Sequence, residues 1–409
     1  MLSNTGVSKN TSFILVAVLA GVPALCIRAL HFTDASDAMH SPGLNAAIFS
    51  LGIVGSAFLL SWAAEVAQKD ISQGLALAIV ALIVVLPEYA VDFYLTWQAG
   101  QNPAGEYVGY ATANMTGANR LLIGLGWPIV IGVAWYRLKG PVRLQKALSL
   151  EILFLALATA YAFSIPFSGG ISIWDGFVMV ALFAIYMWRS SKGEVGEPDI
   201  LGPAESMSRL RTPLRQTVII LLLVYAATVI VISAEPFAES LLSLGDHLGV
   251  DEFLLVQWVA PLASESPEIL VALIFALKDQ APASMTMLIS SKVNQWTLLV
   301  GTLPFVYVAS LGEFSWGGLP LDSRQSQEVW LTAAQSFFAL VILLRWRIGW
   351  MGALALFLPW AIQLVFVSES IRYVFTFAYM AVGGAILIGD PLRRAGVMQI
   401  LQSIRRGRM

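Results

Sequence analysis

The sequence has very little of what disulfides, metal–cysteine clusters and histidine-based sites are built from. Cys26 is the single cysteine, and the three histidines, His31, His40 and His247, lie far apart in the chain. An intrachain disulfide and a cysteine cluster are therefore excluded, and neither a zinc site nor a catalytic histidine is indicated. The glycine-rich phosphate loop G-x-x-x-x-G-K-S/T is also missing, so work driven by ATP is not expected.

Charged residues are scarce as well. They make up only 12% of the 409 residues, and the formal net charge is −2, so the chain has no basic field that would attract nucleic acid. The first apolar run is not followed by a cleavage site of the A-x-A type, which favours a membrane helix over a removed signal peptide.

Hydrophobic residues, in contrast, make up 57% of the chain, more than soluble domains contain. A helix that crosses a bilayer needs about 20 apolar residues, and twelve such windows can be marked, which predicts an all-α polytopic membrane protein. The windows are residues 12–31, 44–67, 73–98, 108–136, 147–165, 171–188, 215–243, 252–277, 285–311, 328–345, 349–367 and 371–390.

Lysine and arginine residues gather in alternate loops of this arrangement. With the N-terminus inside, nineteen of the 24 Lys and Arg residues lie on the cytoplasmic side, in accordance with the preference of positive loops for the cytoplasm. Both termini are then expected to be cytoplasmic, in a plasma or inner membrane. Arg120 and Lys292 fall inside predicted helices.

The longest polar connection lies near the middle of the chain and is expected to be a flexible cytoplasmic linker. It divides the chain into two halves. The predicted organisation is an extra N-terminal helix and loop at 1–43, a first repeat of five helices at 44–188, the linker at 189–214, a second repeat of five helices at 215–367, and an extra C-terminal helix with a basic cytoplasmic tail at 368–409.

The two halves contain the same motifs in the same order. Four features recur, and they are the acidic residues Glu65 and Glu239, the pairs Pro87-Glu88 and Pro267-Glu268, the asparagines Asn119 and Asn294, and the glycines Gly126 and Gly301. Four corresponding features in order indicate an internal repeat. Its motif regions extend over about 83–126 and 239–304.

The Pro-Glu pairs are predicted to lie at the centres of the third and eighth helices. Because these helices are five apart, they cross the membrane in opposite directions, which predicts inverted repeats. Proline removes a helix hydrogen bond and is expected to break each helix, and freed carbonyl groups are tolerated only where they line a cavity or are buried in protein. Many secondary transporters place their ion sites at such breaks.

These motifs resemble those of the sodium/calcium exchanger superfamily of cation antiporters. That family carries a G-T-S-L-P-E motif on one helix of each repeat and a motif with G-S-N on the next. The counterparts here are residues 83–88 and 263–268 for the first motif, and 117–119 and 292–294 for the second. The resemblance covers about 44–136 and 215–311, and it implies alternating-access exchange of Ca²⁺ or Na⁺ for H⁺ or Na⁺.

Several family ligands are replaced, which identifies a divergent member. Where the family has Thr and Ser hydroxyls that bind sodium, the first repeat has Val84 and Val85, and the second has Ser264 and Glu265. Leu122 and Thr297 stand where the family has a further Asn or Asp.

Glu88 and Glu268 are predicted to bind the transported cation. A charged group in the bilayer centre costs roughly 2.5 to 3.5 kcal/mol, and hard cations such as Ca²⁺ take oxygen ligands. Glu265 lies one helical turn before Glu268, and repulsion between the two carboxylates favours a proton on one of them, which suits proton coupling. Ser264 and Asp92 are further candidate ligands, and the alternative for Asp92 is a hydrated carboxylate near the outer surface.

Three amides and two internal bases complete the candidate site. Asn119, Asn294 and Gln295 offer oxygen ligands, although amides also join membrane helices. Lys292 and Arg120 are predicted to be charge partners of the internal acids. Lys292 either takes the place of sodium and exchanges partners with the transported ion or forms a static pair, and a static pair is favoured for Arg120.

The leading hypothesis is a secondary active antiporter, not an enzyme, with no cofactor apart from the transported cation and H⁺. Its expected partners are the lipid bilayer and small cations, without nucleic acid or ATP. Two alternatives stay open. One is an exchanger-like scaffold whose site has decayed into internal Lys–Glu pairs, and the other is an intramembrane enzyme with Glu265 and Glu268 as acid and base.

Overall fold

The computed structural model describes residues 4–31, 41–70, 83, 85–145, 148–192, 200 and 202–405, and these residues are almost entirely helical. Nine helices in this part of the chain are long and apolar enough to cross a membrane. The all-helical membrane class is therefore confirmed. Residues 73–82 and 84 of the predicted third helix lie outside the described residues, and the layout of twelve helices in inverted repeats stays a prediction.

The chain folds into two units. Unit 1 consists of Met1–Tyr94 and Ser191–Glu268, and unit 2 consists of Leu95–Ser190 and Ile269–Met409. Helices α4 (Leu86–Gln101) and α11 (Glu252–Leu277) each begin in unit 1 and end in unit 2. Each predicted repeat therefore contributes to both units.

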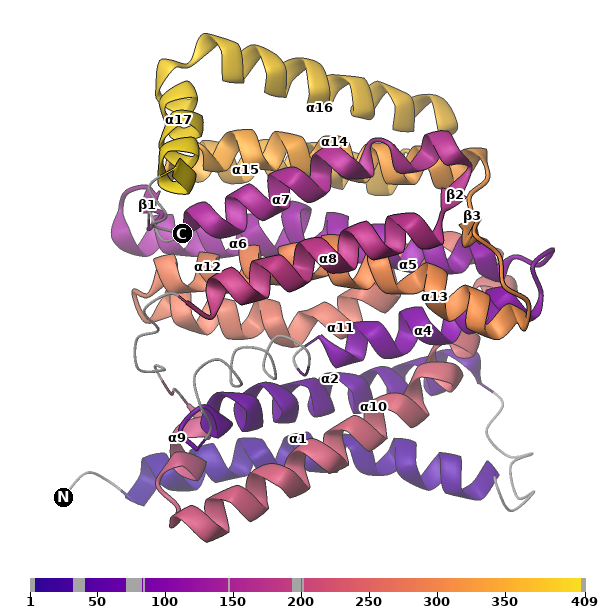
Figure 1. Cartoon of the computed structure of the whole chain (residues 1–409). Coiled ribbons are helices and arrows are strands. Elements are labelled where there is room, and N and C mark those ends of the chain that lie inside the picture. Colours follow the sequence, from indigo (N-terminus) through magenta and orange to yellow (C-terminus); the bar gives the residue numbers. More distant parts are fainter. Residues whose placement is uncertain are drawn as a thin grey trace. The chain divides into compact units, whose positions relative to one another are not determined.

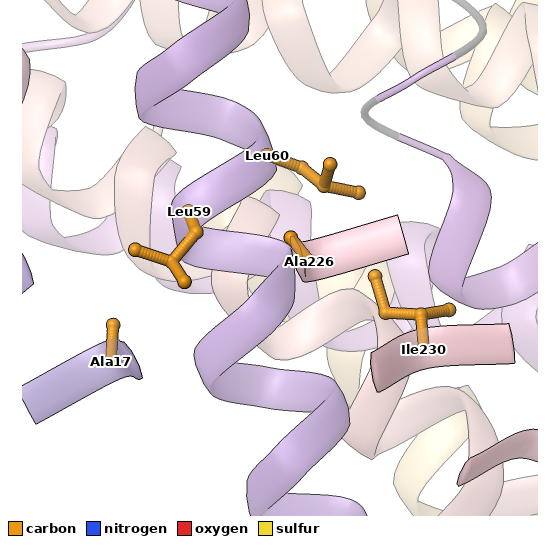
Figure 2. Packing of buried hydrophobic residues seen from close by; sticks show 5 residues of the cluster. All are labelled: Ala17, Leu59, Leu60, Ala226 and Ile230. Carbon is orange, nitrogen blue, oxygen red and sulfur yellow. The ribbon is translucent and has the colours of Figure 1, made fainter. Parts of the chain in front are cut away.

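Unit 1 is built around helix α2, which packs against α1 and α10. Its helices in the described residues are α1 (Asn4–His31), α2 (Pro42–Ala67), α9 (Pro203–Ser208) and α10 (Thr212–Leu248), together with the first parts of α4 and α11. Figure 2 shows the contact between three of them, where Ala17 of α1 and Ala226 of α10 lie near Leu59 and Leu60 of α2. Small residues let membrane helices approach closely, and the outward side chain of Phe13, which is 58% exposed, suits contact with lipid.

The predicted linker at 189–214 contains a packed helix, so the expectation of a wholly flexible segment is wrong. Ala204 and Met207 of α9 are buried against Ala63, Val66 and Ile219 of α2 and α10. This apolar contact anchors the helix, because the hydrophobic effect favours removing these side chains from water.

Arg215, in the first turn of α10, joins three segments at this end of unit 1. Its Nε donates to Asp70 Oδ2 at 2.9 Å, and its Nη1 donates to the carbonyl oxygens of Leu210 at 3.2 Å and Ser208 at 3.5 Å. The guanidinium therefore connects the segment after α2 with the segment that follows α9.

The Asp70–Arg215 pair is expected to make stability depend on pH below about pH 4. The Arg215 hydrogen bond holds the pKa of Asp70 below its ordinary value, so the unfolded chain takes up the proton first as the pH falls from about 4. The stabilisation is complete above the unfolded pKa and is lost as the pH falls through the lower folded value. Melting temperatures of wild type and Asp70→Asn should differ at pH 6 and converge at the lowest pH, and a constant difference would contradict this.

Unit 2 contains the remaining helices, with two short antiparallel strand pairs (Figure 1). β1 (Val142–Arg143) pairs with β4 (Arg347–Ile348), and β2 (Gly170–Ile171) pairs with β3 (Leu319–Pro320). Each pair joins a loop of one half of the sequence to a loop of the other. The helices are α5 (Tyr107–Leu121), η1 (Leu122–Gly126), α6 (Trp127–Leu138), α7 (Ser149–Ala162), η3 (Ile165–Ser168), α8 (Ile173–Ser190), α12 (Ala281–Asn294), η4 (Gln295–Leu299), α13 (Val300–Leu311), α14 (Ser323–Leu343), α15 (Trp350–Val365), α16 (Glu369–Gly389) and α17 (Pro391–Arg405).

A π-helical turn occurs twice in unit 2, each time just after one of the paired asparagines. η1 begins three residues after Asn119 and η4 begins directly after Asn294, and in both cases the helix continues without interruption. A π turn widens the helix and often marks a functional site. In η1 the widened turn lies against Trp360, since a Cβ at Gly124 would be only 2.1 Å from its Cγ atom, so only glycine fits there.

Candidate ion-binding site

Four acidic side chains of unit 1 form a carboxylate cluster: Glu88, Asp92, Glu265 and Glu268. Glu88 and Glu265 are each 2% exposed, Asp92 is 0% exposed, and Glu268 is half-buried. The burial of Asp92 rules out a hydrated surface carboxylate. The acids come from two stretches of sequence, the start of α4 and the middle of α11.

Glu88 is the member on which the others act. Its carboxyl group shares a hydrogen bond with that of Glu265, and the charges of Glu265, Asp92 and Glu268 all act on it. Two carboxyl groups can share a hydrogen bond only if one of them carries a proton. A buried group of acids needs protons or cations to balance its charge, and a proton shared between Glu88 and Glu265 would supply part of that balance.

The start of α4 suits an acidic residue. α4 begins at Leu86, and Pro87 lies in its first turn, where the missing N–H of proline costs no helix hydrogen bond. Glu88 follows in the same turn, where the unpaired N–H groups and the positive end of the helix dipole favour negative charge.

α11 runs unbroken from Glu252 to Leu277, so the predicted break at Pro267 is wrong. Proline at this position removes the hydrogen bond to the carbonyl of Ala263. The hydroxyl of Ser266 donates to that same carbonyl oxygen at 3.3 Å, which replaces the lost bond and lets the helix continue.

Ser264, a predicted ligand, is half-buried in the same turn of α11. Its hydroxyl donates to the carbonyl oxygens of Ala260 and Pro261, both at 3.3 Å. The hydroxyl proton is thereby directed into the helix, and the lone pairs of the oxygen stay available to accept a hydrogen bond or bind a cation.

Within the described residues, no group of three or more His, Cys, Asp and Glu side chains is arranged to hold a metal ion. The cluster is therefore not a preformed metal cage.

The predicted polar residues of unit 2 fall into two groups. In the first, Lys292 donates to the backbone carbonyl of Asn119 at 3.2 Å and to the side-chain oxygen of the same residue. Asn294 and Gln295 are buried in the helix that carries Lys292, at the start of η4. Their role as ion ligands, like that of Asn119, stays a prediction, and so does partner exchange by Lys292.

The second group surrounds Arg120, whose ionic partner is Glu328 of α14 and not one of the acids named from the sequence. Arg120 Nη2 lies 2.7 Å from Glu328 Oε2, and the two side chains are 2% and 3% exposed. Arg120 Nη1 also donates to Gln363 Oε1 at 3.3 Å, and Gln335 Nε2 donates to the Arg120 carbonyl at 3.3 Å. Arg120 thus forms an ion pair with a residue that the sequence did not indicate, and a static role for that pair stays a prediction.

Glu328 was missed although α14 carries a visible signal. Glu328, Thr332 and Gln335 recur at helical spacing along an apolar helix, and all three are buried. A polar stripe of this kind on a membrane helix indicates an interior contact. Glu239, another recurring acid of unit 1, accepts a hydrogen bond from Tyr94 at 2.6 Å.

Comparison with known families decides the relationship. The family model described as sodium/calcium exchanger protein matches residues 40–192 and 218–368, which together make up most of the chain. The chain belongs to the sodium/calcium exchanger family. No curated protein sequence gives a significant match.

Solved structures support this assignment. One described as the H⁺/Ca²⁺ exchanger CAX is 44% identical, covers 98% of each chain and superimposes with a TM-score of 0.91. The structure of native YfkE is 16% identical over 86% of this chain and 98% of its own, with a TM-score of 0.59. The sodium-calcium exchanger NCX_Mj is 18% identical over 81% of this chain and 100% of its own, with a TM-score of 0.54. The last two show a shared fold.

Proposed function

We propose that this exchanger-family protein moves Ca²⁺ across the membrane in exchange for H⁺. The observation that carries the proposal is the buried pairing of the Glu88 and Glu265 carboxyl groups, whose mutual repulsion is relieved by a proton or by a bound cation. The 44% identity to a structure described as an H⁺/Ca²⁺ exchanger also supports Ca²⁺ and H⁺ as the two exchanged ions. Two alternatives, an exchanger-like scaffold that no longer transports ions and an intramembrane enzyme, are less favoured. Membership of an exchanger family and the buried cluster of carboxylates both support ion exchange.

The exchange follows from competition for the same oxygen atoms. Ca²⁺ takes six to eight oxygen ligands, including carboxylates that bind through one or both oxygens. Glu88 and Glu265 can both bind the ion as carboxylates only after a proton shared between them has left, and Glu268 and the hydroxyl of Ser264 can add further oxygens. Release of Ca²⁺ leaves like charges together in a buried site, which restores the demand for protons.

The proposed orientation places both termini in the cytoplasm of a plasma or inner membrane. The distribution of Lys and Arg along the chain supports it, since nineteen of 24 then fall on the cytoplasmic side. No cofactor apart from the exchanged ions is proposed, and the partners are the bilayer and small cations.

Reconstituted vesicles test the exchange. We expect an imposed pH gradient to drive Ca²⁺ movement equally well in sodium and in choline buffers, and Ca²⁺ movement to carry protons the opposite way. Glu265→Gln should weaken the dependence of transport on pH, because the glutamine amide can donate a hydrogen bond to Glu88 but does not titrate. A strict requirement for sodium, or no response to the pH gradient, would overturn the proposal.

A further inference from the structure

Lys292 is held like a bound cation. Its side chain is 0% exposed, and its ammonium contacts two oxygen atoms of a single residue, the backbone carbonyl and the side-chain amide of Asn119. The ammonium also lies 4.7 Å from the ring centre of Trp296, over its face. Two oxygen ligands and the face of an aromatic ring are groups that stabilise monovalent cations.

Helix α5 itself orients these two oxygen atoms of Asn119. Asn119 Nδ2 donates to the carbonyl of Met115 at 2.8 Å, one turn earlier in the same helix. This bond fixes the amide so that Oδ1 is directed at Lys292, and the backbone carbonyl of Asn119, three residues before the π turn begins, joins it. Asn119 therefore presents two preoriented oxygen atoms, and the ammonium and the ring of Trp296 come from the other helix, α12 with η4.

In the second repeat, the carbonyl of the paired asparagine, Asn294, accepts a hydrogen bond from a neutral side chain and not from a cation. There the hydroxyl of Thr297 donates to the carbonyl of Val293 and, at 3.5 Å, to that of Asn294. The position that matches Thr297 in the first repeat is Leu122, which has no donor. The carbonyl of Asn119 accepts instead from the ammonium of Lys292.

We propose that Lys292 is a covalently attached substitute for an alkali cation, seated in a site made by Asn119 and Trp296. The natural protein excludes Na⁺ and K⁺ from this site because the ammonium already fills it. Removing the ammonium while leaving space behind converts the site into one that binds a free monovalent cation. This inference does not rest on the proposed Ca²⁺/H⁺ exchange, because it concerns binding at Asn119.

Thermal stability of the purified protein measures such binding directly. Lys292→Ala removes the charge and opens space, so Na⁺ or K⁺ should raise its melting temperature more than choline does at the same ionic strength. At ten times the dissociation constant the rise should be about 1 to 3 °C. Lys292→Met is the matched control, because it removes the same charge but fills the space, and it should respond to alkali cations no more than wild type does.

A second substitution locates the response. Adding Asn119→Leu to Lys292→Ala removes the side-chain oxygen and should abolish the extra stabilisation by alkali cations. If Lys292→Ala is not folded in choline buffer, Na⁺, K⁺ or methylammonium should restore folding of both Lys292→Ala and Lys292→Ser, because each of these cations supplies the missing positive charge.

Three outcomes would overturn the inference. The first is an alkali response of Lys292→Ala no larger than that of wild type. The second is an equal response of Lys292→Met, which would place the effect elsewhere. The third is failure of alkali and methylammonium salts to recover unfolded Lys292→Ala and Lys292→Ser.

Discussion

Replacing Glu88 or Glu268 by glutamine is expected to abolish Ca²⁺ transport, with initial rates in reconstituted vesicles below about a hundredth of the wild-type rate. Removing one charged partner from a buried charged contact costs roughly 2 to 5 kcal/mol, and every 1.4 kcal/mol corresponds to about a tenfold change. Glutamine keeps the size of the side chain, so the protein should still fold. The loss is then attributable to the missing carboxylate.

Glu239→Gln is the matched control for these substitutions. Glu239 belongs to the same unit and accepts a hydrogen bond from Tyr94, but it is not among the acids that act on Glu88. Its replacement should leave transport within about twofold of wild type, since the carbonyl of glutamine can still accept from the phenol. Normal transport by both Glu88→Gln and Glu268→Gln, with folding verified by size-exclusion profile, would contradict the assignment of the cluster as the ion site.

The sequence predicts the positions of the helices well because a helix that crosses a membrane is apolar along its whole length, and a continuous apolar window is easily recognised. Hydropathy placed α11 at Glu252–Leu277, and the positions of Asn119 and Asn294 before a glycine marked two helices that each contain a π turn. These are local signals, repeated within the chain, so they need no knowledge of tertiary contacts.

The effect of Pro267 was not predictable from the motif alone. A proline in a helix removes one hydrogen bond, and whether the helix breaks depends on what satisfies the carbonyl left behind. Ser266 does so here through its own hydroxyl. The pattern Ser-Pro was visible, but the rotamer that turns the hydroxyl back to Ala263 is a property of the folded helix.

Partners that are distant in the sequence were the least predictable part of the site. Glu88 bonds to Glu265, although the repeat pairs Glu88 with Glu268 and leaves Val85 opposite Glu265. Arg120 pairs with Glu328, a residue outside both motif regions. Internal repeats predict which positions correspond, whereas packing decides which side chains touch, and the two need not coincide.

Removing either member of the Arg120–Glu328 pair is expected to be strongly destabilising. Both side chains are buried, so each single replacement leaves a buried charge without its nearest partner, and breaking a buried pair costs roughly 3 to 5 kcal/mol. The two singles should not be equal. Arg372 Nε lies 3.7 Å from Glu328 Oε1, so Arg120→Leu leaves Glu328 with a second base, whereas Glu328→Leu leaves both Arg120 and Arg372 without their acid.

The double variant Arg120→Leu/Glu328→Leu should recover most of the stability lost by the singles, because exchanging a buried ion pair for apolar residues of similar size is often close to neutral. Melting curves in detergent would give the order Glu328→Leu lowest, Arg120→Leu next and the double variant nearest wild type. Arg372→Met, at a base with a 13% exposed side chain, should have the smallest effect of the single substitutions. Losses that simply add in the double variant would mean that the two residues stabilise the protein independently.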